Sequence, residues 1–393
     1  MMNRNLTLPT FLFALLLGGC AAVLPIPTSQ PVCPPCAPGT EPEKPKPTAK
    51  PLQAADWADL PGWAADDHAA VLDLFRQQCT SLAKRPLWLA TCEAAQKVGA
   101  GGTARAWFEA QFRPWVLVNP DDKREGMVTG YYEPIVRGSR NQKPPYTVPV
   151  FGPPEDMIVV DLGELYPELK HMRLRGKLDG RKLVPYFSRA EWSAEEVRRS
   201  QQALLWLDDP IDFFFLQIQG SGQVALDDGS RVRIGYADQN GHPYRSIGRW
   251  LIDQGELKSH EASMQGIKAW AAANPRRLQE LFNTNPSLVF FRELPVTGNG
   301  PPGALGIPLT PERSIAVDPR HTPLGAPVWL ATTRPNSDES LQRLMLAQDT
   351  GGAIRGPVRA DYYWGSGADA GTQAGKMKQS GQMWVLLPRG HTP

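Results

Sequence analysis

The sequence predicts a mainly β protein with a helical N-terminal segment. Two observations support this fold class. From about Asp56 to Glu109, apolar residues recur at helical spacing, most clearly over 67–75 and 88–95. From Met127 onward, short β-prone runs alternate with Gly, Pro and Asp turns, which is typical of β-barrels and sandwiches. A further helical stretch is expected at about residues 247–282.

The first twenty residues have the features of an export signal. Arg4 precedes an apolar run, residues 11–17, that is too short to cross a bilayer as a mature helix. Leu17-Gly18-Gly19-Cys20 resembles the lipobox of bacterial lipoproteins, whose cysteine is lipidated and becomes the new N-terminus. We therefore expect a signal peptide at 1–19 and a lipid on Cys20. The alternative is an ordinary signal peptide with a chance cysteine. Ala21 in place of an aspartate favours the periplasmic face of the outer membrane.

A proline-rich tether is expected at residues 20–55. Ten prolines lie between positions 25 and 51, with almost no large apolar residues, so this part cannot form a packed core. Cys33 and Cys36 lie in this tether as a CxxC pair. A redox site needs a helix N-terminus or a similar environment to lower a thiol pKa, which a proline-rich tether does not offer. Whether these two cysteines pair with each other stays open.

Cys79 and Cys92 lie near the ends of two expected helices that are joined around Pro86. Export would place them in an oxidising compartment. A disulfide between them is therefore predicted, and two buried thiols are the alternative.

The expected strands follow the β-prone runs of the chain. Up to the second helical stretch these runs are 128–132, 146–151, 157–160, 213–219 and 231–236. In the last hundred residues they are 314–317, 327–330, 344–347 and 383–387.

Charge and motif content exclude several classes of function. A net charge of +2, evenly spread, gives no support for nucleic-acid binding. The six histidines form no HxxH or HExxH pattern, and the chain has no Walker loop or GxGxxG. We therefore expect neither a metal nor another cofactor. Gly220-Ser221-Gly222 is interpreted as a glycine turn between strands rather than as a nucleophilic serine.

Three aspartates of the final third are candidates for chemistry. Asp318, Asp349 and Asp361 each lie at a strand end or beside glycines, and Tyr362-Tyr363-Trp364 follows the last of them. Carboxylic acids with neighbouring aromatic rings, on which sugars stack, are typical of glycosidic cleavage. For any one of them alone, the alternative is an Asx turn.

Several segments taken together carry a more specific signal. They are VTGYYEP (128–134), VPYFSR (184–189), QIQGSG (217–222), GYADQNG (235–241), 244–248, 285–287 and the three aspartate segments. In this order they resemble the membrane-bound lytic murein transglycosylase A (MltA) family over roughly Glu125 to Leu387. The last hundred residues also resemble the 3D domain, which is named for three aspartates.

The resemblance implies a fold of two domains with a groove between them. A double-psi β-barrel, with the N-terminal helices, would be built from residues 56–134 and 291–390. A smaller β-barrel would be inserted at 135–290.

The resemblance also implies an activity and roles for residues. The family cuts the β-1,4 bond between N-acetylmuramic acid and N-acetylglucosamine in peptidoglycan, leaves a 1,6-anhydromuramic end and uses no cofactor. Asp361 matches the general acid/base, with a raised pKa, and Asp349 and Asp318 match positioning and electrostatic roles. Substrate-binding roles are expected for six further residues, namely Thr129, Tyr131, Ser221, Asn240, Tyr362 and Trp364.

Two other functions remain as alternatives. One is a peptidoglycan hydrolase that uses water, and the other is a non-catalytic peptidoglycan-binding lipoprotein. We expect a monomer that acts on glycan strands, is held at the membrane by its lipid, and has possible partners in cell-wall synthesis or hydrolase complexes. Endo or exo action stays open.

Replacing Cys20 with Ala should release the protein into the soluble periplasmic fraction without loss of activity on isolated sacculi, because the tether separates the anchor from the folded part. Cell fractionation measures this outcome. A Cys20→Ala protein that stays with the membranes would show that the anchor has been assigned wrongly.

Overall fold

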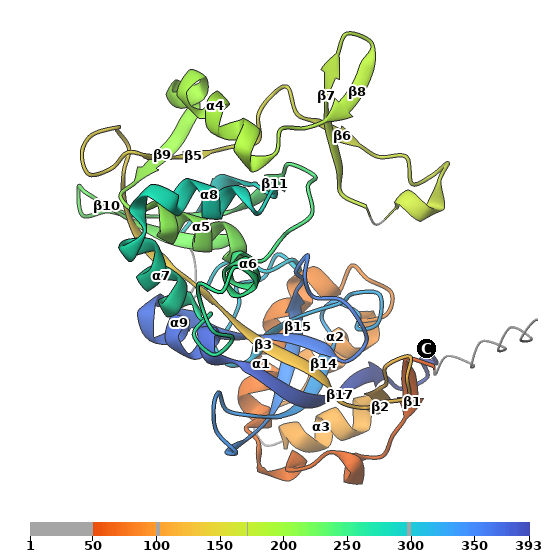
Figure 1. Ribbon diagram of the computed structural model, residues 1–393. Coiled ribbons are helices and arrows are strands. Elements are labelled where there is room, and N and C mark those ends of the chain that lie inside the picture. Colours follow the sequence, from red (N-terminus) through yellow and green to blue (C-terminus); the bar gives the residue numbers. More distant parts are fainter. Residues whose placement is uncertain (1–49, 100–102, 171, 297–299) are drawn as a thin grey trace, which may run out of the picture. The chain divides into compact units, whose positions relative to one another are not determined.

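The computed structural model describes residues 50–99, 103–170, 172–296 and 300–393 (Figure 1). The expected signal peptide, Cys20, Cys33, Cys36 and most of the tether lie outside the described residues. The described residues fall within one compact unit, 48–393. None of its described helices is both long enough and apolar enough to cross a bilayer.

Six strands form a closed, hydrogen-bonded ring. Its order is β17-β14-β15-β13-β16-β3, and β3 pairs again with β17. The pairs β13–β15 and β3–β16 are parallel, and the other four are antiparallel. The ring therefore joins β3 to strands more than two hundred residues later in the chain (Figure 1). The strands are β3 (Gly126–Glu133), β13 (Ser314–Val317), β14 (Pro327–Thr333), β15 (Ser340–Asp349), β16 (Arg359–Ser366) and β17 (Lys378–Pro388).

The N-terminal segment packs against this ring. It consists of the strands β1 (Leu52–Ala54) and β2 (Phe112–Leu117), which extend the sheet from β17, and the helices α1 (His68–Leu82), α2 (Leu89–Gln96) and α3 (Ala104–Gln111). Phe75, Phe108 and Phe112 are fully buried and belong to the same hydrophobic core as the ring. The expected helical segment is therefore present. Between β16 and β17 the chain forms α9 (Gly367–Lys376), which packs on β3.

A disulfide joins Cys79 in α1 to Cys92 in α2, with the two Cα atoms 5.5 Å apart. Both residues are buried in the core beneath these helices. The bond lies where the sequence predicts it.

A second, six-stranded sheet follows directly from the ring, because β3 continues through Pro134 into β4. Its order is β12-β11-β10-β4-β9-β5. The strands are β4 (Ile135–Ser139), β5 (Val148–Phe151), β9 (Ala203–Leu207), β10 (Ser221–Leu226), β11 (Arg231–Gln239) and β12 (Val289–Leu294). Since β12 ends at Leu294, this sheet runs past the boundary expected at residue 290.

Between β4 and β12, the described residues also form five α-helices and a small third sheet. The helices are α4 (Arg189–Arg199), α5 (Pro210–Gln219), α6 (Ile247–Asp253), α7 (Met264–Ala273) and α8 (Leu278–Asn283). The third sheet, with order β6-β7-β8, contains β6 (Ile158–Val160), β7 (Leu174–Asp179) and β8 (Lys182–Pro185) (Figure 1). Single turns of 3-10 helix lie at Trp57–Asp59, Trp63–Ala65, Pro167–Leu169, Ser200–Gln202 and Pro275–Arg277.

One expected strand is wrong, because residues 213–219 form the end of helix α5. The side chain of Asp209 accepts hydrogen bonds from the backbone N–H groups of Ile211 and Asp212, and Pro210 occupies the first turn. Gly220 ends the helix in the left-handed conformation, with φ of 78°. A capping aspartate, a proline at the first helical position and a C-terminal glycine outweigh the β propensity of the phenylalanines.

Removing the disulfide should lower the stability of the folded unit. In the chain-entropy model, a closed loop with a sequence separation of 13 contributes about 3 kcal/mol. Chemical denaturation of Cys79→Ser/Cys92→Ser against the unreduced wild type measures the loss. Thiol titration of the unfolded, unreduced wild type is the control, and two alkylatable cysteines at these positions would contradict the prediction.

Candidate active site

The parallel pairing of β3 with β16 builds the centre of the site. Thr129 lies opposite Asp361 in the register, and Tyr131 lies opposite Tyr363. Alternate residues of a strand point to the same face, so these four side chains share one face of the pair. Gly130 lies between them on the other face, where an added Cβ would meet the Trp364 indole at 2.7 Å. The glycine of the VTGYY segment is thus needed for close packing behind the site.

Asp361 is held by a directed chain of hydrogen bonds. The hydroxyl of Thr129 donates to Oδ1 of Asp361 at 2.6 Å, and Nη2 of Arg359 donates to the same hydroxyl at 2.9 Å. A guanidinium has donors only. The Thr129 oxygen therefore accepts from Arg359, and its single proton points to Asp361. Because Oδ1 already accepts, an acidic proton on Asp361 belongs on Oδ2.

The electrostatic environment of Asp361 favours a protonated carboxyl. Burial raises its pKa to about 6; the Thr129 hydrogen bond and the Arg359 charge lower it, and nearby Asp349 raises it. A carboxyl with this pKa holds its proton far closer to neutral pH than an ordinary aspartate does. It is suited to general acid catalysis followed by general base catalysis.

Asp349, the last residue of β15, lies next to this centre. Its Oδ2 accepts from the hydroxyl of Tyr131 at 3.1 Å, and its Oδ1 accepts from the backbone N–H of Ala304 at 2.9 Å. Burial raises the pKa of Asp349, and the hydrogen bonds from Ala304, Thr350 and Tyr131 lower it less. Asp349 therefore fixes the position of the tyrosine ring.

Asp318 has a different environment from the other two aspartates. It is 1 % exposed, and its carboxylate accepts from Nη2 of Arg320 at 2.6 Å and from the N–H of Gly356 at 2.9 Å. Burial acts to raise its pKa, but Arg320 and the backbone donors hold it well below the usual range. Asp318 is thus an anion at neutral pH. It anchors the loop that connects Asp349 to Asp361.

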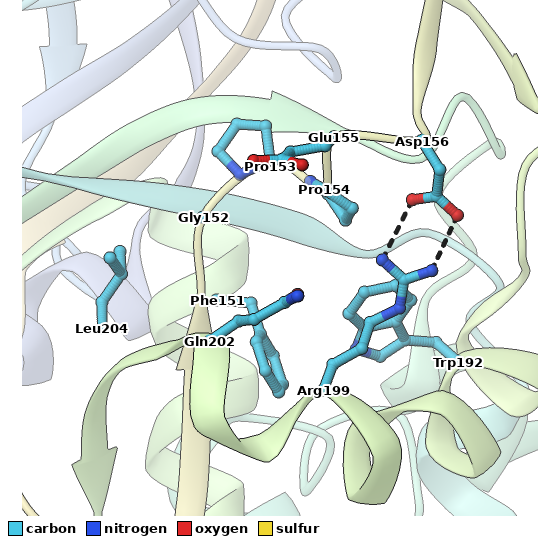
Figure 2. A pocket seen from close by; sticks show the side chains of 10 residues that line it. All are labelled: Phe151, Gly152, Pro153, Pro154, Glu155, Asp156, Trp192, Arg199, Gln202 and Leu204. Atoms are coloured by element: carbon cyan, nitrogen blue, oxygen red, sulfur yellow. Dashed lines mark hydrogen bonds and ion pairs between the residues drawn. The ribbon is translucent and has the colours of Figure 1, made fainter.

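A cavity of about 660 Å³ lies between the second sheet and this loop. Ser221, Tyr236 and Gln239 line it from the second sheet, and Asp349 with residues 350–353 lines it from the ring. A second cavity of about 510 Å³ is lined by Trp192, Asp156 and Arg199 and by none of the three candidate aspartates (Figure 2). We therefore place the candidate site at the first cavity.

Comparison with known sequences identifies the family. Residues 127–292 match the MltA specific insert domain, and residues 313–387 match the 3D domain. A membrane-bound lytic murein transglycosylase A from Escherichia coli K12 is 33% identical over 294 residues, which cover 73% of this chain and 72% of that protein. The chain belongs to the membrane-bound lytic murein transglycosylase A (MltA) family.

Solved structures of the MltA family have the same fold. MltA from Neisseria gonorrhoeae is 39% identical, with a TM-score of 0.76 over 87% of this chain and 94% of that one. Escherichia coli MltA with bound chitohexaose is 28% identical, with a TM-score of 0.68 over 86% of this chain and 95% of that one.

In this MltA-family chain, three of the residues expected to bind substrate are buried in the interior instead of facing the candidate site. Asn240 is 1 % exposed, and its amide bonds to the backbone at Phe187, Pro286 and Leu288. Tyr362 and Trp364 pack in the hydrophobic core of the ring. They alternate with Asp361 along β16, so they point to the opposite face. These three residues are structural, which corrects the expectation.

Two residues at the MltA-family site were missed by the sequence analysis. Arg359 reaches Thr129, and the ring of Tyr363 packs against that of Tyr131 with centroids 5.2 Å apart. Both lie two residues from Asp361, so the period of a β-strand could have placed them on its face. Within the described part of the chain, no group of three or more His, Cys, Asp or Glu residues is arranged to hold a metal ion.

Asp361→Asn should stabilise the fold at alkaline pH. The folded-state pKa of Asp361 is about 6, raised from 3.8, so the wild type loses stability as pH rises through 6 while the amide does not. At pH 8 the free energy of unfolding of the variant should exceed that of the wild type by up to about 3 kcal/mol, and this difference should vanish below pH about 4. Chemical denaturation at several pH values measures the difference.

Asp318→Asn is the matched control for that comparison. The pKa of Asp318 is lowered in the folded state, so replacing it with Asn should destabilise the protein at neutral pH, and less so in acid. If both variants changed stability in the same direction at pH 8, the electrostatic assignment of the two aspartates would be refuted.

Proposed function

We propose that the protein is a lytic transglycosylase that cleaves the β-1,4 bond between N-acetylmuramic acid and N-acetylglucosamine in peptidoglycan. The supporting observation is the carboxyl of Asp361, with its raised pKa and its directed contact to Thr129. Family membership supports the same activity, because the relatives are named lytic murein transglycosylases. The chitohexaose bound to the Escherichia coli protein supports a glycan ligand for this cavity.

In the proposed first step, Asp361 acts as general acid. Its Oδ2 proton passes to the glycosidic oxygen as the bond from that oxygen to C1 of the muramic acid breaks. The leaving N-acetylglucosamine then carries the hydroxyl. Thr129 stays bonded to Oδ1 throughout, and Arg359 holds Thr129, so the developing carboxylate is stabilised as it forms.

In the second step, the 6-hydroxyl of the same muramic acid attacks C1 and gives its proton to Asp361. This closes the 1,6-anhydro ring and restores the acid without consuming water. Intramolecular attack profits from a high effective molarity. An ordinary glycosidase needs a second carboxylate as nucleophile or base. Asp349 is bonded to Tyr131 and Ala304 and has a raised pKa, so a positioning role fits it better.

We extend the proposal to architecture. A double-psi β-barrel, built from residues 56–134 and 291–390, is supported by the closed six-stranded ring with its two parallel pairs. A smaller barrel inserted at 135–290 is supported by contact between β5 and β12, the two outer strands of the second sheet.

We also propose a cellular setting, namely the periplasmic face of the outer membrane, with a lipid on Cys20 and a role in cell-wall remodelling and turnover. The relatives are named membrane-bound, which supports an anchor. A monomer, with possible contacts to cell-wall synthesis or hydrolase complexes, belongs to the same proposal.

Asp361→Asn should abolish release of anhydromuropeptides from sacculi. General acid catalysis contributes about 10²–10⁴-fold, and the loss should reach the upper end because no other proton donor is proposed. Wild-type activity should fall as pH rises through about 6, where the acid loses its proton. Mass spectrometry of the products measures both effects, and reducing ends without anhydro sugar would indicate a hydrolase.

Asp349→Asn is the matched comparison for the catalytic variant. It should lose less activity than Asp361→Asn, with binding to sacculi and circular dichroism as controls for folding. If folded Asp361→Asn kept more than about a tenth of the activity, equivalent to about 1.4 kcal/mol, while Asp349→Asn was inactive, the acid would have been assigned to the wrong residue.

A further inference from the structure

Two arginines line the catalytic cavity without an acidic partner in the described part of the chain. Arg173, which precedes β7, and Arg292, on β12, are both exposed and both border the cavity. Arg292 lies opposite Gly235 in the register of β11 and β12. Arg292 is on the second sheet and Arg173 directly precedes the third, and both border the same cavity as Asp349.

Arg173 extends across the cavity. Its guanidinium carbon lies 5.5 Å from the centre of the Tyr236 ring, and Nη1 lies 3.5 Å from the Tyr236 hydroxyl. The same Nη1 lies 3.9 Å from where a Cβ on Gly352 would be, so the side chain reaches the loop after Asp349. Arg173 thus connects the second sheet to the loop between Asp349 and Asp361.

Asp238, which follows Tyr236 on β11, and Asp349, which lines the cavity, both have other hydrogen-bond partners. Asp238 is paired with Arg175, with Nε 2.9 Å from each carboxylate oxygen. Asp349 accepts from Tyr131 and Ala304. The other cavity differs, because there Arg199 is neutralised by a two-point contact with Asp156 (Figure 2). The catalytic cavity therefore carries two arginines that have no ion-pair partner among the described residues.

The proposed substrate contains a matching group. Its N-acetylated sugars are neutral, but muramic acid carries a lactyl ether on O3. This ether ends in a carboxylate when it is free, and it leads to the carboxylates of a stem peptide when it is substituted. Guanidinium groups bind carboxylates with two parallel hydrogen bonds.

We propose that Arg173 and Arg292 form a carboxylate-binding subsite for the lactyl or peptide substituent of muramic acid. This inference rests on the proposed function. The subsite would distinguish peptidoglycan from neutral chitin-type glycans and would set the muramic acid, rather than N-acetylglucosamine, at the bond to be cut.

Binding of three probes to the full chain tests the subsite, in an Asp361→Asn background so that no probe is consumed. Chitohexaose has no carboxylate, amidase-treated glycan strands have free lactyl carboxylates, and untreated strands carry peptide carboxylates. Arg173→Gln and Arg292→Gln should each weaken binding of a carboxylate-bearing probe about tenfold or more, as expected for the loss of a charge-assisted hydrogen bond. Binding of chitohexaose should change by less than about twofold. The probe whose binding is weakened identifies the source of the carboxylate.

Two control variants accompany the test. Arg173→Lys keeps the charge and should restore part of the lost affinity. Arg276→Gln removes an exposed arginine that lies outside this cavity and should change none of the affinities. The proposal is overturned if binding of chitohexaose is weakened as much as binding of the other probes, or if binding of no probe is weakened. Failure of the proposed function is distinguishable, because the otherwise wild-type chain would then release no anhydro sugar from sacculi.

Discussion

A buried ion pair at the end of β3 holds the two halves of the site together. Glu133 is fully buried and accepts from Nε of Arg233 at 2.7 Å, from Gln223 at 2.8 Å and from Ser366 at 2.7 Å. Arg233 and Gln223 belong to the second sheet, and Ser366 ends β16 of the ring. Removing one partner of a buried ion pair destabilises a protein by about 3–5 kcal/mol. The need to satisfy the charge of Glu133 therefore defines the junction between the ring and the second sheet.

The geometry of the cavity depends on that junction. β3 carries Thr129 and Tyr131 on the ring side of Glu133, and within two residues the chain enters the second sheet. The acid and the opposite wall of the cavity are therefore connected through a short, rigid length of strand. A displacement of the second sheet would move Ser221 and Tyr236 relative to Asp361 without disturbing the hydrogen bonds of the acid itself.

The three aspartates have different roles because their burial and their hydrogen-bond donors differ. Asp318 accepts from a guanidinium and a backbone N–H and remains charged, which suits an anchor for a loop. Asp361 has the Thr129 hydroxyl and a more distant cation, and burial keeps its proton available. Burial also raises the pKa of Asp349, which orients Tyr131. Identical side chains thus acquire different proton affinities from their surroundings.

The sequence by itself determined the class of the fold, eight of the seventeen described strands, the paired cysteines and the three aspartates, because periodicity, turn residues and motif spacing are local properties. It could also have placed Arg359 and Tyr363 beside Asp361, since strand alternation is local. Only the tertiary structure decided that Asn240, Tyr362 and Trp364 are buried, that β3 pairs with β16, and that Arg173 reaches the cavity. These facts depend on contacts between residues that lie 46 to 232 positions apart in the chain, which no local pattern encodes.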